Sequence, residues 1–385
     1  MSNVSQKHSV LMVLENGYPM EKGGGAEAQL NTLGTRMSSL GWGVEIIAPM
    51  VSYASQVSNE LVNGIPVHRI KYPKIRILGG VFMLFSLALY LIKHRASYDV
   101  IHVHIASNMA AVCSLIGALI NKPVLIKLTG WTEIKNGILD NKISLRIKLL
   151  KWAIKKASYY QATSQQIASL LYERGFDKDK IHLIPNAVDT DRFNSDQKIT
   201  IPSELKAEKI GIFVGRLVKE KNLELFFTAF NNVFTDEDSV SLIIIGHGYL
   251  RQSLEDYVKK LGVKNKIHFI GPKSDVENYI SMAHFGILPS LYEGLSNTLL
   301  EYMSSAIPVL GSRVSGTEDI IEHGKNGWLF DSENLTELTE YLNVIKNTSN
   351  ETLLEMGNAG RKYIVDYAGI NSVTNRIMKL YFKKC

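Results

Sequence analysis

Short apolar runs, each closed by a polar or glycine-rich turn, recur along the chain and predict buried strands. Longer stretches with apolar residues at helical spacing lie between many of them. Strands that alternate with helices predict an α/β fold with parallel sheets. The predicted strands are residues 9–14, 43–48, 99–104, 123–128, 181–186, 209–214, 241–245, 266–271, 285–289, 307–310 and 327–330. The predicted helices that bear on function are residues 26–40, 77–92, 142–156 and 359–384.

Residues 289–301 combine a strand end, a polar loop and the start of an apolar helix. The free N–H groups and the positive dipole end of such a helix suit an anionic group. Glu293 lies in the loop and Glu301 lies about one turn inside the helix, so the two carboxylates can serve one ligand at different heights. A capped helix with two solvated acids is the alternative that the residues alone leave open.

Two further turns carry residue types that suit phosphate. Gly23-Gly24-Gly25 precedes the helix that starts at Ala26, and glycines permit close approach of the backbone to a ligand. A flexible surface loop is the alternative there. Gly215 and Arg216 follow the strand 209–214, and Lys221 leads into the next helix. A guanidinium fork beside an ammonium group suits a diphosphate.

The sequence Glu-Gly-Leu-Ser-Asn-Thr-Leu-Leu-Glu at 293–301 resembles a signature of the retaining glycosyltransferases of family 4, also called group 1, whose architecture is the GT-B fold. Stretches at 23–27, 99–104, 185–189 and 214–217 with Lys221 resemble the same family, in the same order. The resemblance implies two Rossmann-like, doubly wound domains that face each other across a cleft. The implied divisions are an N-terminal acceptor-binding domain (1–193), a polar linker (194–206), a sugar-nucleotide domain (207–358) and a C-terminal helix that crosses back to the first domain (359–385).

The resemblance also implies a role for individual residues. Glu293, Arg216 and Lys221 are the implied catalytic residues, and the two cations offset the charge of the departing diphosphate. Glu301 is implied to bind the ribose hydroxyls, and Glu293 to bind the transferred sugar. The other implied donor-binding residues are Gly24, Gly25, Thr129, Gly215, Gly271, Leu295, Ser296, Asn297 and Thr298.

Thr129 stands where many relatives have a histidine that contacts the donor sugar. A threonine hydroxyl can form a hydrogen bond with a sugar but cannot act as a base near neutral pH. Lys127 is expected to supply part of the missing charge. His104 is expected to line the cleft at the end of its strand. His102 and His104 share one face of that strand, but no metal site is expected because no third ligand stands nearby.

The implied activity is retaining transfer of a hexosyl unit from a UDP- or GDP-linked sugar to a lipid-linked glycan, in polysaccharide or glycolipid biosynthesis. No metal or other cofactor is expected, because Arg216 and Lys221 replace a divalent cation. Asp189-Thr190-Asp191 resembles the metal-binding motif of a different glycosyltransferase fold, but beside Pro185-Asn186 it predicts a turn. A sugar-nucleotide epimerase of similar fold and a non-catalytic nucleotide-sugar binding protein are the alternatives.

The net charge of +6 is unevenly distributed over the 385 residues. Residues 1–200 hold 23 Lys and Arg against 14 Asp and Glu, whereas residues 201–385 hold 20 against 23. No nucleic-acid recognition motif accompanies the basic half, so nucleic acid is not an expected partner. An anionic membrane surface or a pyrophosphate-bearing acceptor explains the asymmetry better.

Residues 77–92 form an apolar run that is shorter than the roughly 20 residues of a membrane span and is flanked by Lys and Arg. The run predicts either a helix packed on the domain or a helix inserted at a bilayer surface. Residues 142–156, a basic amphipathic helix, leave a similar choice between a solvated face and a membrane surface. Two cysteines and a short apolar stretch at the N-terminus favour a cytoplasmic protein, peripheral on the inner face of the cell membrane.

Overall fold

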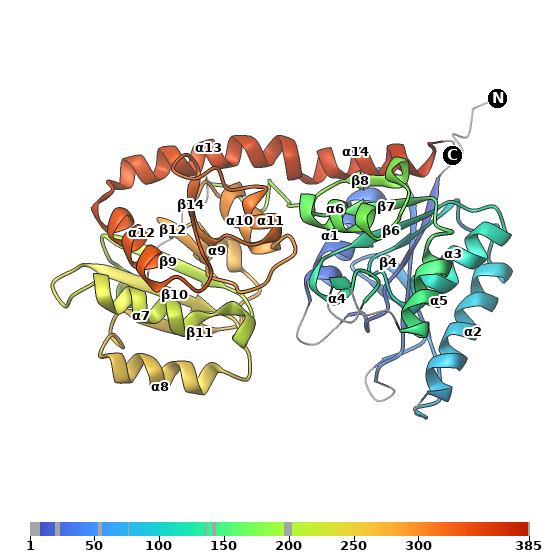
Figure 1. The fold of residues 1–385 in the computed structure, drawn as a ribbon, viewed down its shortest axis with the longest axis horizontal. Coiled ribbons are helices and arrows are strands. Elements are labelled where there is room, and N and C mark those ends of the chain that lie inside the picture. Colours follow the sequence, from blue (N-terminus) through green and yellow to red (C-terminus); the bar gives the residue numbers. More distant parts are fainter. Residues whose placement is uncertain are drawn as a thin grey trace. The chain divides into compact units, whose positions relative to one another are not determined.

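The computed structural model describes residues 8–19, 24–52, 56–75, 77–134, 137–140, 144–195 and 202–383, without the side chains of residues 131 and 132. The chain divides into two compact units, residues 1–187 with 370–385 and residues 188–369. Each unit has its own hydrophobic cores. Figure 1 shows each unit as a sheet with helices packed on it.

The first unit is built on an eight-stranded sheet in the order β3-β4-β2-β1-β5-β6-β7-β8. Its strands are β1 (Ser9–Val13), β2 (Gly43–Pro49), β3 (Asn59–Val62), β4 (Ile65–Ile70), β5 (Val100–Val103), β6 (Val124–Leu128), β7 (Tyr159–Ala162) and β8 (Ile181–Leu183). Neighbouring strands run parallel, except in the β3–β4 hairpin. The central strands are buried on both faces, as parallel strands between helix layers must be.

Helices cover both faces of this sheet. On one face lie α1 (Gly25–Ser39) and α14 (Ile370–Tyr381), whose buried side chains share a core with Val10 and Met12 of β1. The other face shares a core with Leu11 and Val13 and is covered by α2 (Leu78–Lys93), α3 (Asn108–Leu119), α5 (Leu145–Ile154) and α6 (Gln165–Glu173). The short helix α4 (Trp131–Ile134) follows β6, and the 3-10 turn η1 (Lys178–Lys180) precedes β8.

The second unit has a six-stranded parallel sheet in the order β11-β10-β9-β12-β13-β14. Its strands are β9 (Lys209–Val214), β10 (Val240–Ile245), β11 (Ile267–Gly271), β12 (Phe285–Leu288), β13 (Val309–Ser312) and β14 (Gly327–Phe330). Its helices are α7 (Leu223–Val233), α8 (Arg251–Leu261), α9 (Val276–Ile280), α10 (Asn297–Ser304), α11 (Ser315–Glu318), α12 (Leu335–Asn347) and α13 (Asn350–Ala368), with 3-10 turns η2 (Ser203–Leu205) and η3 (Lys219–Lys221). The two sheets confirm the predicted α/β fold with two Rossmann-like units.

Three strands of the first unit are absent from the prediction, and each lacks a continuous apolar run. The exposed edge strand β3 and its partner β4 form a hairpin closed by Asn63-Gly64, both at positive φ (51° and 78°). Asn-Gly between two strands is a strong hairpin signal, so this turn was visible in the sequence. The third strand, β7, is interrupted by the polar Gln161.

The C-terminal tail contains two helices rather than the single predicted helix 359–384. The break falls at Gly369, whose ψ of 141° is not helical and where an added Cβ would lie 2.3 Å from the Val365 carbonyl oxygen. The helix before the break, α13, belongs to the second unit, and α14 belongs to the first. At the ends of the predicted linker 194–206, Phe193 and Leu205 are both buried in a core of the second unit.

Candidate functional site

The strand order of the second sheet reverses between its two central strands, β9 and β12. Connections from β9 lead toward β10 and β11, whereas connections from β12 lead toward β13 and β14. In open α/β sheets, ligands bind beyond the carboxyl ends of the strands at such a switch point. The chain leaves β9 at Val214 and β12 at Leu288, and two of the three predicted anion-binding turns, at 215–221 and 289–301, follow directly from these ends.

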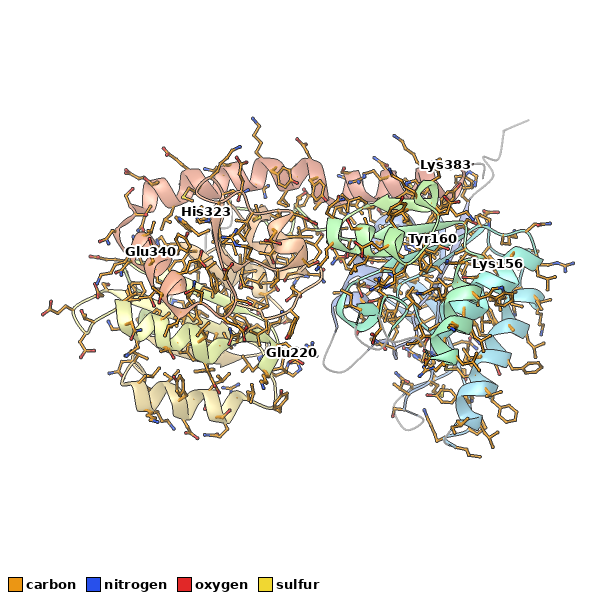
Figure 2. The ribbon with its side chains drawn as sticks, in the orientation of Figure 1. Lys156, Tyr160, Glu220, His323, Glu340 and Lys383 are labelled. Carbon is orange, nitrogen blue, oxygen red and sulfur yellow. The ribbon has the colours of Figure 1, made fainter. Side chains whose placement is uncertain are left out.

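The two turns are joined through an ion pair between Lys221 and Glu293. Lys221 Nζ also lies 3.4 Å from Ser290 Oγ, which donates to Glu293 Oε2 at 3.1 Å. The backbone adds a further link, because Leu291 N donates to the carbonyl oxygen of Glu220 at 2.8 Å. Figure 2 labels Glu220, which lies in η3 beside Lys221. The structure therefore brings together two of the three predicted catalytic residues, as a half-buried cation and its carboxylate partner.

The third predicted catalytic residue, Arg216, is exposed at the end of β9. Its neighbour Gly215 is held in place by a hydrogen bond from Gly215 N to the Ile245 carbonyl oxygen at 3.0 Å. An added Cβ at Gly246 would lie 1.8 Å from the Gly215 carbonyl oxygen. The turns that follow β9 and β10 are therefore in direct backbone contact. Gly246 N in turn donates to the carbonyl oxygen of Gly271, at 3.1 Å. This contact fixes the backbone at Gly271, the last residue of β11.

Helix α10 begins at Asn297 beside the end of β9, with Leu295 and Ser296 buried just before it. Thr298 Oγ1 donates to the Val214 carbonyl oxygen at 3.3 Å. One turn further on, the Tyr302 hydroxyl accepts from Val214 N at 2.7 Å and donates to the Ile212 carbonyl oxygen at 3.1 Å. These bonds hold the helix N-terminus, the positive end of the helix dipole, next to the turn that carries Arg216 and Lys221.

Tyr302 is a positioning residue that sequence reasoning missed. Its ring is fully buried and packs against Gly286, where an added Cβ would lie 2.4 Å from a ring carbon. The signal in the sequence was weak, because a tyrosine inside an apolar helix is usually a core residue. The Tyr302 hydroxyl reaches the backbone of β9 because β12, on which the ring packs, lies next to β9. The sequence does not show this pairing.

The side chain of Glu301, a residue of intermediate exposure, lies near the ion pair of Arg192 with Glu277 (2.7 Å). Burial raises the pKa of Glu301 to about 7, with Arg192 lowering it and Glu277 raising it further. A carboxyl group that titrates near neutral pH is typical of functional sites.

In the first unit, Gly24 and Gly25 lie exposed at the start of α1, where Gly24 is the N-cap residue. An added Cβ at Gly24 would meet nothing within 4 Å, and its φ of −149° suits any residue. The fold of the unit therefore does not require glycine at this position. A ligand that approaches the backbone would explain it.

Thr129 lies at the end of β6 and is tied to Glu133, a buried acid that sequence reasoning missed. Both Glu133 oxygens lie 3.4 Å from Thr129 Oγ1, and the carboxylate accepts backbone N–H groups of Ala106, Thr129 and Gly130 at 3.1–3.4 Å. Glu133 is therefore the residue that shapes the loop around Thr129. The signal was a lone acid four residues after Thr129, which a solvated helix start would explain equally well.

We expect Glu133→Gln to disturb this loop more than Thr129→Ala does. The alanine variant loses one long hydrogen bond, worth roughly 0.5–1.5 kcal/mol, whereas the glutamine amide cannot accept all the N–H groups that the carboxylate accepts. Hydrogen exchange of the peptide that covers 124–134 measures loop opening directly. Equal exchange in both variants would contradict the shaping role of Glu133.

Two expectations for the first unit are wrong. His104 does not line a cleft: it is fully buried and stacks on His102 with 4.3 Å between ring centroids. Lys127 does not supply charge at Thr129, because its side chain is only 3% exposed and its Nζ lies 3.5 Å from Gln29 Oε1 in the core. Side chains alternate along β6, so Lys127 lies on the same face as Leu125, which packs in the core with α1 and α14.

The buried histidines are held as a neutral pair. Burial, and after it Lys127, lowers the pKa of His102 to about 3, and burial with His102 and Lys127 lowers the pKa of His104 well below its usual value. His102 Nδ1 is bonded to the Tyr381 hydroxyl of α14 at 2.8 Å. Within the described residues, no group of three or more His, Cys, Asp and Glu side chains could hold a metal ion.

The Asp189-Thr190-Asp191 segment closes a turn in the second unit, as predicted. Asp189 Oδ1 accepts from the backbone N–H groups of Asp191 and Arg192, both at 3.1 Å. This is the usual turn chemistry of aspartate.

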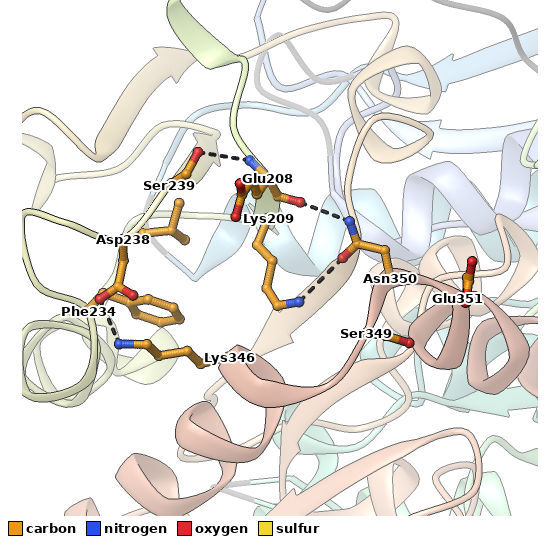
Figure 3. A pocket seen from close by; sticks show the side chains of 10 residues that line it. Glu208, Lys209, Phe234, Asp238, Ser239, Lys346, Ser349, Asn350 and Glu351 are labelled. Atoms are coloured by element: carbon orange, nitrogen blue, oxygen red, sulfur yellow. Dashed lines mark hydrogen bonds and ion pairs between the residues drawn. The ribbon is translucent and has the colours of Figure 1, made fainter.

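A hollow of about 510 Å³ lies at the opposite end of the second sheet, where β9 and β10 begin (Figure 3). Its lysines are already engaged: Lys346 Nζ lies 2.7 Å from Asp238, and Lys209 Nζ donates to the Thr348 carbonyl oxygen at 2.6 Å. Asn350 Nδ2 donates to the Glu208 carbonyl oxygen at 3.0 Å. These contacts fasten the start of α13 to the sheet, which gives the hollow a structural role.

The protein has two doubly wound units. The second carries cations, a carboxylate and a helix N-terminus at its switch point, an arrangement typical of proteins that bind a phosphorylated ligand. Two family models match the chain: Glycosyltransferase Family 4 over residues 23–192 and Glycosyl transferases group 1 over residues 194–363. The chain belongs to these glycosyltransferases, and its fold is GT-B.

The relatives agree with this assignment. The chain is 23% identical over 296 residues to N-acetyl-alpha-D-glucosaminyl L-malate synthase of Bacillus anthracis, with 76% of each chain covered. It is 25% identical over 310 residues to UDP-Gal:alpha-D-GlcNAc-diphosphoundecaprenol alpha-1,3-galactosyltransferase of Escherichia coli, with 77% of this chain and 78% of that one covered. The crystal structure of HepE from Anabaena in complex with UDP has the same fold, with a TM-score of 0.75, 18% identity and 96% and 98% coverage.

Proposed function

We propose that this protein is a retaining glycosyltransferase that moves a hexosyl unit from a UDP- or GDP-linked sugar to a lipid-linked glycan, in polysaccharide or glycolipid biosynthesis. The observation that carries the proposal is the arrangement at the β9/β12 switch point. There, the Lys221–Glu293 pair, Arg216 and the N-terminus of α10 follow from two adjacent strand ends. The Escherichia coli relative, whose name specifies a diphosphoundecaprenol acceptor, supports the lipid-linked acceptor.

In this proposal the second unit holds the donor. Arg216, Lys221 and the N–H groups at the start of α10 stabilise the diphosphate as its bond to the sugar breaks. The backbone at Gly271 contacts the base, and Glu301 accepts from the ribose hydroxyls. Glu293 binds the transferred sugar and, through their ion pair, also holds Lys221 in place.

The first unit presents the acceptor, with Gly24, Gly25 and Thr129 contributing to the donor sugar site. An oxygen of the departing diphosphate takes the proton of the acceptor hydroxyl, while the new bond forms on the face of the sugar that the diphosphate leaves. This route gives retention without a separate protein base. The enzyme works in the cytoplasm as a peripheral protein on the inner face of the cell membrane.

The test is nucleotide release measured on a panel of sugar nucleotides, with and without a membrane lipid extract as acceptor. One donor should give release that the extract accelerates, and the product should carry the sugar with retained anomeric configuration. An epimerised sugar nucleotide formed without acceptor would favour an epimerase. Donor binding with neither transfer nor hydrolysis would favour a non-catalytic protein.

We expect transfer to survive chelation, because Arg216 and Lys221 supply the positive charge that a divalent cation supplies elsewhere. The rate with excess EDTA should stay within about twofold of the untreated rate, a difference worth less than roughly 0.5 kcal/mol. Loss of transfer that manganese restores would contradict this expectation and direct attention to Asp189 and Asp191.

Donor affinity is expected to rise between pH 6 and pH 8. The pKa of Glu301 is raised to about 7, so the carboxylate that accepts from ribose forms only as the pH passes that value. Glu301→Gln should bind the donor about 1–2 kcal/mol more weakly at pH 8 and lose this pH dependence. Calorimetry with the intact sugar nucleotide measures both. The same affinity in wild type and variant would remove the ribose role.

A further inference from the structure

The outward side of α2 carries a stripe of large apolar side chains that nothing in the described part of the chain covers. Their spacing of three and four residues places them on one side of the helix, and Phe85 is 59% exposed. Met83, Leu87 and Leu91 lie on the opposite side, in the core. The exposed residues are Leu78, Val81, Phe82, Phe85, Leu89 and Ile92.

The two helices next in this layer add to the stripe. α2 packs beside α3, and α3 packs beside α5 (Figure 1). All three helices bury their inward sides against the same face of the sheet, so their outward sides share one surface. The exposed apolar residues there are Leu115 and Leu119 of α3 and Leu145, Leu149 and Trp152 of α5. Apolar surface on this scale marks an interaction site.

The charge of this surface has one sign. None of α2, α3 and α5 contains Asp or Glu. The cations on or next to them are Lys93, Arg95, Arg146, Lys148, Lys151, Lys155 and Lys156. Figure 2 shows Lys156 just past the end of α5, and its Nζ lies 5.8 Å from the ring centroid of the exposed Trp152. Tryptophan beside lysine is typical of a membrane–water interface.

We infer that α2, α3 and α5 form a docking surface for an anionic lipid bilayer. The apolar stripe of α2 enters the interfacial layer, and the cations of α5 face the lipid phosphates. With 16 residues, α2 is shorter than a span, and none of the described helices is long and apolar enough to cross a membrane. The inference rests on the proposed membrane location and identifies the surface that produces it.

A second copy of this chain is the competing occupant, and the charges disfavour it. A two-fold interface places the same patch on both partners. Cations without a single acidic residue among the three helices would then face one another, which is unfavourable. An anionic bilayer offers the complementary charge.

Flotation with vesicles tests the inference without any sugar nucleotide, so its failure is distinct from failure of the transfer reaction. Wild type should bind vesicles that contain phosphatidylglycerol at least tenfold more strongly than pure phosphatidylcholine vesicles, because each cation adds roughly fivefold in partition near an anionic surface. Phe82→Ser with Phe85→Ser and Leu89→Ser should lower binding at least tenfold. Changing five cations to Gln should lower binding by a similar factor: Arg146, Lys148 and Lys151 of α5, and Lys155 and Lys156 just after it.

Matched controls lie in the second unit. Leu354→Ser with Val365→Ser removes exposed apolar residues, and Lys259→Gln with Lys260→Gln and Lys264→Gln removes exposed cations; neither should change flotation. Brominated lipids should quench tryptophan fluorescence in the wild type. Trp152→Phe should reduce that quenching, and because Trp152 is exposed this substitution does not disturb the fold. Equal binding to neutral vesicles, normal binding by the α2 variant, or a dimer that the α2 variant abolishes would each overturn the inference.

Discussion

Glu293→Ala is expected to reduce transfer by roughly 10²–10³-fold or more while changing the affinity for free nucleotide only a few-fold. The reason is the half-buried ion pair with Lys221 at the switch point. Without the carboxylate, Lys221 loses its fixed position and the sugar loses its anionic contact. The ammonium group can still reach a diphosphate, so nucleotide binding is retained. Steady-state kinetics and calorimetry with free nucleotide separate the two effects.

The neighbouring acid Glu220 offers a matched control. Its side chain is exposed, and its contact with the β12 loop is made by its backbone carbonyl group, so Glu220→Ala should leave transfer unchanged. Glu293→Gln keeps the shape of the side chain and can still accept a hydrogen bond from Ser290, but it removes the negative charge. Because the ion pair with Lys221 is lost, its transfer rate should lie close to that of the alanine variant. Transfer above about a tenth of the wild-type rate in Glu293→Ala would contradict both roles.

The parts of the fold that could be predicted are those encoded over short distances. A parallel strand buried on both faces is a continuous apolar run, and the turn after it holds glycine or a charged residue, so β9, β12 and their loops were visible in the sequence. The β3–β4 hairpin was missed because its edge strand has exposed, polar positions. The break at Gly369 was missed because both flanking stretches have helical spacing.

The parts of the site that could not be predicted depend on contacts between distant residues. The sequence predicts both Glu293 and Lys221 as site residues, but their ion pair exists only because β12 lies next to β9. The same pairing brings Tyr302 to the β9 backbone. Lys127 is buried because of the face of β6 that it occupies. The sequence does not reveal that face, because the residues on both sides of Lys127 are apolar.

Lys127 is a buried cation without a carboxylate partner among the groups that face it in the described core. Those groups are Gln29 of α1, His102 of β5, His104 just after β5, and Gln161, which pairs with Lys127 between β6 and β7. Burial lowers the pKa of Lys127 from 10.5 to about 7. The folded unit therefore bears the full cost of the buried charge at and below about pH 7. Gln29 Oε1 also accepts from Ala187 N at 2.7 Å, so it keeps a partner if the amine is removed.

Lys127→Met is therefore expected to stabilise the first unit on the order of 3–5 kcal/mol at pH 7 and progressively less toward pH 10. Between about pH 7 and pH 10.5 the unfolded chain binds a proton that the folded unit does not, so the free energy of unfolding of the wild type rises with pH in this window. The variant lacks that rise. Above about pH 7.5 the two histidines are mostly neutral in both states and add little to this rise. Hydrogen exchange of β5 and β6 peptides in urea, compared at equal pH, reports on this unit alone. Lys178→Met, at an exposed position, serves as the control. A stability difference between Lys127→Met and wild type that stays constant from pH 7 to pH 10 would show that the Lys127 amine is not the titrating group.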